Sequence, residues 1–242
     1  MIFPDPLVRG TLLRRYKRFL ADVDLETGET VIAHCANSGS MLSVDAPGSE
    51  VWLSPARNPD RKLKYTWELI RIGETLVGIN TGHPNAIVAE AVAAGEIPEL
   101  NGYTSARREV KYGRNSRIDL LLEGPGRPRC FVEVKNVTLR REGGPERPVE
   151  FPDAVTARGA KHLAELSNMV RDGDRAVMMY LVQREDADWF TLADDIDPAY
   201  AEAFEQATAV GVEALCYRCR VSPRDIRISQ AVRISHPDQS AR

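Results

Sequence analysis

The segment 131–137 carries two charged side chains, Glu133 and Lys135, two residues apart in a mostly apolar run. Side chains two apart on a β-strand point to the same face, so these two project together while the valines beside them face a core. An apolar run just upstream, 117–122, contains one carboxylate, Asp119. A short turn separates the runs, so we expect the two strands to pair and to bring Asp119 close to Glu133.

Carboxylates a few ångströms apart repel each other unless a proton or a cation lies between them. Hard oxygen ligands suit Mg²⁺ or Mn²⁺, so Asp119 and Glu133 are the predicted metal ligands. A lysine beside a metal-bound water can orient it or stabilise a phosphorane charge, which makes Asp119, Glu133 and Lys135 a candidate catalytic set for phosphodiester hydrolysis. Glu-x-Lys is also a common tripeptide, and an exposed ion pair on a strand is the plainer interpretation.

Further residues near this segment could take part, and each has a plainer interpretation. Glu109, on the preceding predicted strand, could be another ligand, although a pairing with a neighbouring basic residue is favoured. Glu90 lies in an alanine-rich predicted helix, which favours a solvated face. Lys161 and His162 lie on the helix after the motif, where a lone histidine is more often a surface or packing residue than a ligand.

Cys216 and Cys219 form a C-x-x-C pair that could hold zinc or a redox disulfide. A structural zinc site needs about four ligands, and no second pair follows at the required spacing. The surrounding segment 212–221 also has the character of a strand, so a plain strand is favoured over a metal site.

The formal net charge of −3 excludes a uniformly basic coat protein for nucleic acid, so the distribution of charge matters more than its sum. Basic residues form three clusters: Arg9, Arg14, Arg15, Lys17 and Arg18; Arg57, Arg61, Lys62 and Lys64; and Arg107, Arg108, Lys111, Arg114 and Arg117. Most such clusters are simply solvated faces. The candidate contacts to a DNA backbone are Arg14, Arg15, Lys17 and Arg18.

The elements that must position these residues fall into two predicted domains. Residues 1–82 show short alternating runs, bounded by turn signals, at 18–25, 30–35, 50–53, 67–72 and 75–79. Five short strands with no long helical pattern predict a small barrel, and a five-stranded OB-like barrel that binds nucleic acid is the natural expectation.

In the second predicted domain, 83–235, the periodicity changes. The expected elements are a helix over 86–95, strands over 105–112, 117–123 and 129–137, a helix over 154–171, a strand over 176–182 and a helix over 198–209. The order helix, three strands, helix, strand predicts an αβββαβ core of the restriction-endonuclease kind, and the fold class is α/β here and α+β overall. The tail 236–242 is expected to be disordered.

No run approaches the roughly 18 apolar residues needed to span a bilayer. The first residues lack the basic start and apolar run of a signal peptide. We therefore expect no membrane segment and a cytoplasmic protein.

An ordered series of motifs resembles the sugar fermentation stimulation protein family over nearly the whole chain. The motifs are Asn37-Ser38-Gly39, Asn80-Thr81, Pro84-Asn85, 115–122, 132–139, 151–154, Lys161-His162-Leu163 and Gly211-Val212-Glu213. The resemblance implies an N-terminal OB-like domain, a C-terminal domain similar to PD-(D/E)XK nucleases, DNA binding with little sequence preference, and a regulatory link to sugar metabolism in bacteria. It places Asp119, Glu133 and Lys135 in the nuclease motif.

Two positions depart from the family pattern. Ser40 stands where a basic residue is expected, which weakens any role of the 37–40 loop in phosphate contact. Asn136 replaces an expected serine and leaves the predicted metal ligands intact.

Three functions stay open at this point. A DNA-binding protein with a nuclease-like metal site ranks first, a Mg²⁺- or Mn²⁺-dependent nuclease second, and a hydrolase of small phosphoesters a distant third. The intact set of Asp119, Glu133 and Lys135 favours chemistry, but the sequence alone does not establish turnover.

Overall fold

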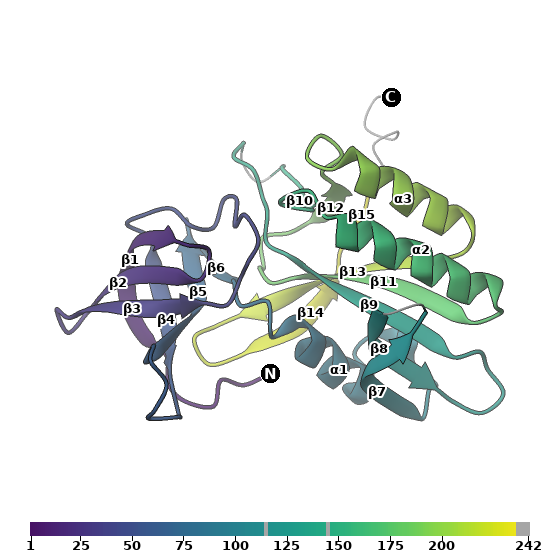
Figure 1. The fold of residues 1–242 in the computed structure, drawn as a ribbon, viewed down its shortest axis with the longest axis horizontal. Coiled ribbons are helices and arrows are strands. Elements are labelled where there is room, and N and C mark those ends of the chain that lie inside the picture. Colours follow the sequence, from purple (N-terminus) through teal and green to yellow (C-terminus); the bar gives the residue numbers. More distant parts are fainter. Residues whose placement is uncertain (114–115, 144–145, 236–242) are drawn as a thin grey trace.

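The computed structural model describes residues 1–113, 116–143 and 146–235. A β-barrel at the N-terminus is followed by a mixed sheet with helices on both faces (Figure 1). The OB-like barrel and the α+β class expected from the sequence are therefore confirmed. Arg114 and the expected tail 236–242 lie outside the described residues.

Five strands form the closed barrel: β1 (Val8–Tyr16), β2 (Leu20–Leu25), β3 (Thr30–Cys35), β4 (Glu50–Pro55) and β5 (Tyr65–Ile72). They follow the order β3-β2-β1-β4-β5, and the parallel pairing of β3 with β5 closes the ring. Inward side chains form one buried cluster, in which Trp67 donates its Nε1–H to the Leu69 carbonyl oxygen over 2.9 Å. Closure satisfies the strand edges that an open sheet would expose.

The membership of the ring differs from the expectation at one strand. The five predicted strands omit β1 and include β6 (Thr75–Gly78), which pairs with β5 outside the ring. Only Gly10 and Leu12 of β1 are buried, so its sequence lacks a clear apolar alternation. Arg18, expected at the start of a strand, lies with Lys17 in a left-handed turn at φ 63° and 49°, respectively.

The remainder of the chain builds a second sheet and its helices. The helices are α1 (Pro84–Ala94), the 3-10 turn η1 (Pro98–Leu100), α2 (Ala157–Arg171) and α3 (Pro198–Ala209). The main strands are β7 (Ser105–Tyr112), β8 (Ser116–Glu123), β9 (Cys130–Val137), β11 (Arg175–Val182), β13 (Glu213–Val221) and β14 (Ile226–Ala231). The sheet order is β14-β13-β11-β9-β8-β7, with β9, β11 and β13 parallel and the outer pairings antiparallel.

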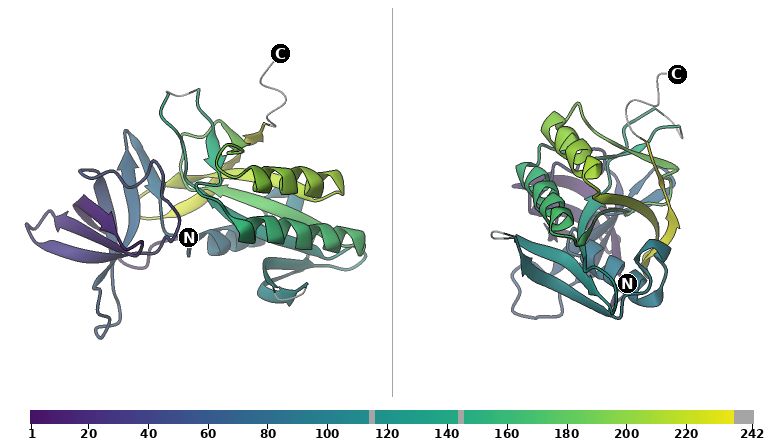
Figure 2. Two further views of the ribbon diagram at one scale, coloured as in Figure 1. Left: turned by 45° about the horizontal axis from the view of Figure 1, so that its top comes forward. Right: turned by 90° about the vertical axis from the view of Figure 1, so that its right-hand side faces the viewer.

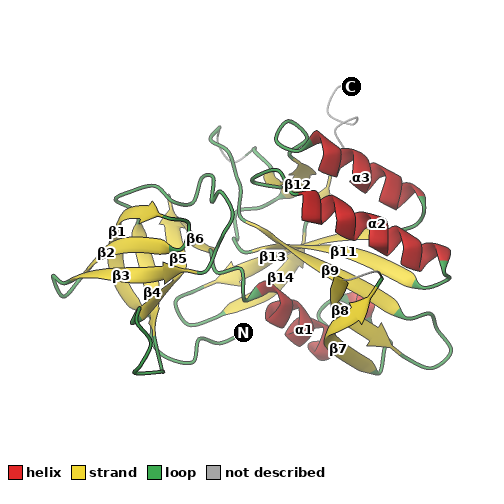
Figure 3. Ribbon diagram, viewed as in Figure 1, coloured by secondary structure: helices red, strands yellow, loops and turns green. Residues whose placement is uncertain are grey.

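The helices cover the two faces of this sheet unequally. Helices α2 and α3 lie together on one face, and α1 lies on the other (Figures 2 and 3). Leu163 and Phe204 accordingly belong to one buried cluster, whereas Ile87 and Val88 belong to another. Within the described residues, none of the helices combines the length and the apolar character that a bilayer crossing requires.

A small three-stranded sheet was not expected from the sequence. It consists of β10 (Val149–Phe151), β12 (Trp189–Leu192) and β15 (Arg233–Ile234), in the order β10-β12-β15 with parallel pairings. Strands of two to four residues are too short to show a periodicity of their own. Helix α2 likewise begins at Ala157 and not near 154, because Thr156 caps it by accepting the Gly159 N–H over 3.1 Å.

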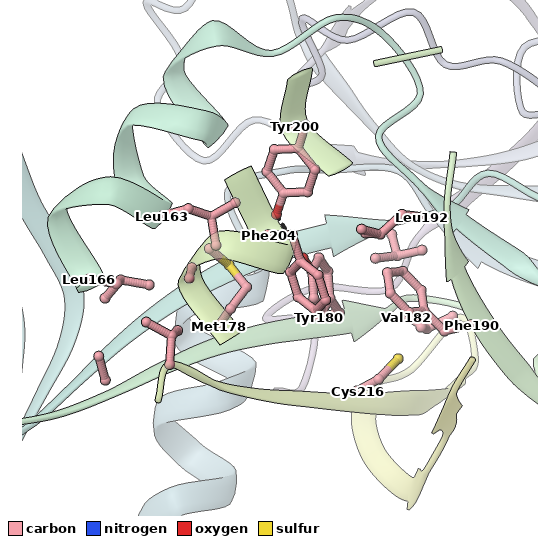
Figure 4. Close-up of a cluster of buried hydrophobic side chains, with 14 of the residues drawn as sticks. Leu163, Leu166, Met178, Tyr180, Val182, Phe190, Leu192, Tyr200, Phe204 and Cys216 are labelled. Carbon is pink, nitrogen blue, oxygen red and sulfur yellow. Dashed lines mark hydrogen bonds between the residues drawn. The ribbon is translucent and has the colours of Figure 1, made fainter. Parts of the chain in front are cut away.

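The cluster beneath α2 and α3 contains one buried polar pair (Figure 4). The hydroxyl groups of Tyr180 on β11 and Tyr200 on α3 are hydrogen bonded over 2.7 Å, and both side chains are fully buried. Each hydroxyl is therefore the partner that satisfies the other in an otherwise apolar interior.

We predict that Tyr180→Phe lowers the free energy of unfolding by about 1–3 kcal/mol, because the Tyr200 hydroxyl is left buried without a partner. The double variant Tyr180→Phe/Tyr200→Phe should lose much less, since both polar groups are removed together. Denaturant unfolding of the wild type, Tyr180→Phe, Tyr200→Phe and the double variant measures this. A double variant that loses the sum of two single losses would contradict the assignment.

Candidate metal and nucleic-acid site

Strands β8 and β9 bring the two predicted metal ligands side by side. The antiparallel ladder ends with the pairing of Leu120 and Val132, and the residues just beyond it are Asp119 on β8 and Glu133 on β9. The Asp119 carboxylate ends the ladder by accepting the Val134 N–H at Oδ2 over 2.8 Å. The closeness expected from the alternation and the short turn is thus present.

Helix α1 provides a second contact to the Asp119 carboxylate. Asn85, in the first turn of α1, donates its Nδ2–H to Asp119 Oδ1 over 2.6 Å. Burial and then the negative charge of Glu133 raise the pKa of Asp119 to about 6, although the hydrogen bonds oppose this shift. Burial and mutual repulsion therefore disfavour the state in which both carboxylates are ionised.

Glu133 is 2% exposed, so the pair it forms with Lys135 is not the exposed ion pair of the plainer interpretation. Its Oε1 accepts from Lys135 Nζ over 2.8 Å and also contacts His162 Nδ1. Burial alone would raise the pKa of Glu133, but His162 and Lys135 outweigh it and the pKa is lowered. Its Oε2 is buried and has no hydrogen-bond partner among the described residues.

His162 lies inside this site and not on the surface. It is 5% exposed, and its Nδ1 lies 3.3 Å from Lys135 Nζ as well as against Glu133. Arg158, one turn earlier on α2, donates its Nε–H to His162 Nε2 over 3.3 Å. The sequence favours a surface or packing role for His162 and does not predict these contacts. They arise from the docking of α2 on β9, which is not visible in the local sequence.

Two further buried groups beside the site were not anticipated. Glu165 is buried on α2, and its Oε1 lies 3.8 Å from Lys161 Nζ. The Glu165 Oε2 and the Tyr112 hydroxyl are buried without hydrogen-bond partners in the described part of the chain. Burial and the charges of Glu133, Glu165 and Asp119 raise the pKa of the Tyr112 phenol.

The other carboxylates considered from the sequence lie in different places. Glu109 is exposed, forms no ion pair within the described ranges, and its Oε1 lies 3.4 Å from Asn85 Nδ2 at the rim of the site. Its favoured pairing with a basic neighbour is therefore wrong. Glu90 pairs with the N-terminal ammonium of Met1 over 2.6 Å and does not reach the site.

A hollow of about 340 Å³ opens beside this cluster. Its lining includes Glu109, His162 and three exposed cations, Arg117, Arg158 and Lys161. Arg117 belongs to the third basic cluster of the sequence, so part of that cluster surrounds the carboxylate pair. Positive charge at the rim of a carboxylate site favours an anionic ligand.

The basic cluster of the barrel is less available than the sequence suggests. Arg14 pairs with Asp22 over 2.7 Å. Arg15 is 10% exposed at its side chain and donates to the carbonyl oxygens of Asn37, Gly39 and Ser40 over 3.0, 2.8 and 3.1 Å. Lys17 and Arg18 are exposed, and neither side chain forms an ion pair or hydrogen bond with another residue of the described ranges.

Cys216 and Cys219 form no common site. Both are buried free thiols on β13, and they belong to the hydrophobic clusters on opposite faces of the sheet. A bulge between Arg218 and Cys219 does not bring the thiols together. The segment is a strand, as expected, with its two thiols on opposite faces of the sheet.

The carboxylate site can be compared with what a divalent cation requires. No group of three or more histidine, cysteine, aspartate or glutamate side chains in the described ranges has a metal-holding arrangement. A Mg²⁺ site commonly uses only one or two carboxylates and completes its shell with water. Each oxygen of Asp119 accepts one N–H and keeps a second lone pair, and Glu133 Oε2 is free, so the donor set fits such a cation.

Comparison with known proteins agrees with the resemblance seen in the sequence. The family models described as the SfsA N-terminal OB domain and the sugar fermentation stimulation protein RE domain match residues 13–79 and 82–225. A sugar fermentation stimulation protein homolog of Rhodospirillum rubrum is 59% identical over 98% of this chain and 100% of its own length. One from Paramagnetospirillum magneticum is 64% identical over 93% of this chain and 94% of its own.

A solved structure shows the same architecture over both parts of the chain. The structure of Pyrococcus furiosus SfsA in complex with Ca²⁺ superimposes with a TM-score of 0.85 at 26% identity, covering 97% of this chain and 98% of that one. Sequence models, curated relatives and a solved structure thus agree over nearly the full length. The chain belongs to the sugar fermentation stimulation protein family.

Proposed function

We propose that this chain binds Mg²⁺ or Mn²⁺ at Asp119 and Glu133 and hydrolyses phosphodiester bonds of a nucleic acid. The buried Glu133 Oε2, which has no partner among the described residues, carries this proposal. An unsatisfied carboxylate oxygen is costly in a protein interior unless a ligand completes it. The Pyrococcus furiosus relative was solved with Ca²⁺, another hard cation that prefers oxygen ligands, which supports the choice.

The chain's own residues have distinct parts in this proposal. Asn85 and the Val134 N–H orient Asp119, while Lys135 and His162 hold Glu133. The cation, when bound, makes its water more acidic and polarises a phosphoryl oxygen. The Lys135 ammonium, 2.8 Å from Glu133 and partly exposed, is placed to stabilise the negative charge that develops on the attacked phosphate.

The charges around the hollow favour a polyanionic substrate. Arg117, Arg158 and Lys161 are exposed there, and they would contact backbone phosphates without reading bases. Lys17 and Arg18 offer a second patch on the barrel. The family resemblance implies DNA binding with little sequence preference, so DNA is the substrate that we propose, and phosphate contacts of this kind agree with that weak preference.

A second candidate is a DNA-binding protein that keeps the metal site without turnover. The basic side chains around the hollow favour this candidate equally, because they can bind backbone phosphates without any hydrolysis. DNA retention without cleavage in Mg²⁺ and Mn²⁺ would select it. Rapid hydrolysis of a small phosphoester, with no cleavage of DNA, would instead select the third function considered from the sequence.

Glu133→Gln is expected to weaken Mn²⁺ binding by more than about 100-fold, because the amide supplies no charged ligand. Calorimetry on the wild type and the variant measures this. The matched control is Glu90→Gln, which changes a glutamate remote from the site and should leave the affinity intact. Equal affinities for all three proteins would exclude Glu133 as a ligand.

Mn²⁺ affinity should depend on pH through Asp119, whose pKa is raised to about 6 in the metal-free protein. A protonated carboxyl group cannot bind the cation, so the affinity should fall about tenfold per pH unit below this value and level off above it. Titrations in a series of buffers test the direction. An affinity that is constant through this range would show that Asp119 is not a ligand.

Lys161→Gln should weaken DNA binding and make its salt dependence shallower by about 0.9 in the slope of log K against log[salt], the value expected for one lost phosphate contact. Fluorescence anisotropy at several salt concentrations provides the slope. Lys62→Gln, an exposed lysine in the loop between β4 and β5, is the charge-matched control. Identical slopes for Lys161→Gln and the wild type would show that Lys161 does not contact a DNA phosphate.

A further inference from the structure

A second hollow of about 340 Å³ begins at Lys135 and extends past the carboxyl end of β9 toward the first turn of α2. It shares no lining residue with the basic hollow near His162. The barrel supplies part of its wall through Asn37, Ser38 and Gly39. Lys135 therefore faces both the carboxylate pair and a cavity to which both parts of the chain contribute.

The wall from the barrel is held firmly in place. Arg15 binds three carbonyl oxygens of loop 37–40. Asp153, from the second part of the chain, accepts the Ser40 hydroxyl and the Met41 N–H at Oδ2 over 3.0 and 2.9 Å. A Cβ on Gly39 would lie 3.1 Å from that same oxygen, so the loop sits tightly against Asp153. The cavity is preformed by these contacts.

The lining combines apolar and polar groups in a way that suits a nucleotide. Phe151 and Leu139 provide apolar surface. Asn136 and Thr138 line the cavity with polar side chains, and the Asn136 Oδ1 already accepts from Gln183, which leaves the Asn136 amide N–H groups as donors. Lys135 supplies a positive charge to the lining, while the two carboxylates that also line it are already engaged, Glu150 with Arg141 and Asp153 with Ser40 and Met41. A base has apolar faces, polar edges and an attached phosphate, and each finds a counterpart here.

We propose that this cavity receives a single unpaired nucleotide of the substrate strand, next to the phosphate that lies at the metal site. This inference rests on the proposed function and adds the substrate class: strand ends, single strands or extruded nucleotides. A cavity of about 340 Å³ lies at the small end of the range that small-molecule pockets occupy, about 300–1,000 Å³, which suits a single nucleotide. A base inside an intact duplex would first have to be unpaired and unstacked, which costs about a few kcal/mol.

Ser38→Trp tests the cavity directly, because Ser38 is exposed, lines the cavity and has no recorded side-chain hydrogen bond. The probes are a labelled single strand and a duplex of the same sequence closed by hairpins at both ends, each in Ca²⁺. We expect the wild type to bind the single strand at least about tenfold more tightly than the closed duplex. Ser38→Trp should lose this preference, and Ser105→Trp, on exposed β7, should keep it.

Equal binding of both probes by the wild type, or an undiminished preference in Ser38→Trp, would overturn the inference. Mn²⁺ calorimetry on the same samples separates this failure from that of the proposed function. Metal binding without any strand preference removes the cavity assignment alone, whereas absence of metal binding in the wild type removes the proposed function as well. Thermal unfolding of each variant checks that the barrel loop has kept its structure.

Discussion

Two carboxylates, Asp119 and Glu133, are held just beyond the same end of the antiparallel ladder between β8 and β9, and the repulsion between them governs how the surrounding residues are arranged. Each carboxylate is stabilised by a different set of neighbours. Asp119 relies on neutral N–H donors from α1 and β9, whereas Glu133 relies on Lys135 and His162. Helices from both faces of the sheet must therefore be docked before the pair is stable, which links the site to the three-layer fold.

The barrel contributes to the region around the site through the packing of one of its loops more than through charged side chains. Arg15 is used to stiffen loop 37–40, and that loop then packs on Asp153. Ser40, which departs from the family pattern, donates its hydroxyl to Asp153 and so joins the two parts of the chain. A position that weakened the expectation of phosphate contact thus has a structural role at the junction.

Local periodicity was sufficient to predict a barrel in the first part of the chain, the succession of the main helices and strands from α1 to β11, and the neighbourhood of Asp119, Glu133 and Lys135. These features depend on alternation within a strand and on short turns, which a single sequence displays. Asn85, His162 and Glu165 reach the site from helices, and their orientation is decided by how α1 and α2 pack on the sheet. Strand β1 escaped prediction for a related reason, since its partners and not its own composition hold it in the ring.

The bond between Ser40 and Asp153 joins residues that are 113 positions apart in the chain. During synthesis the barrel emerges first and can fold while β9 and α2 are still missing. The cavity at Lys135 can form only after the chain has passed Thr156, because its lining residues extend from Asn37 to Thr156. A nascent chain that ends before Asp153 can present Lys17 and Arg18 on the barrel but lacks the residues that complete the cavity, so the exposed basic patch precedes the cavity during synthesis.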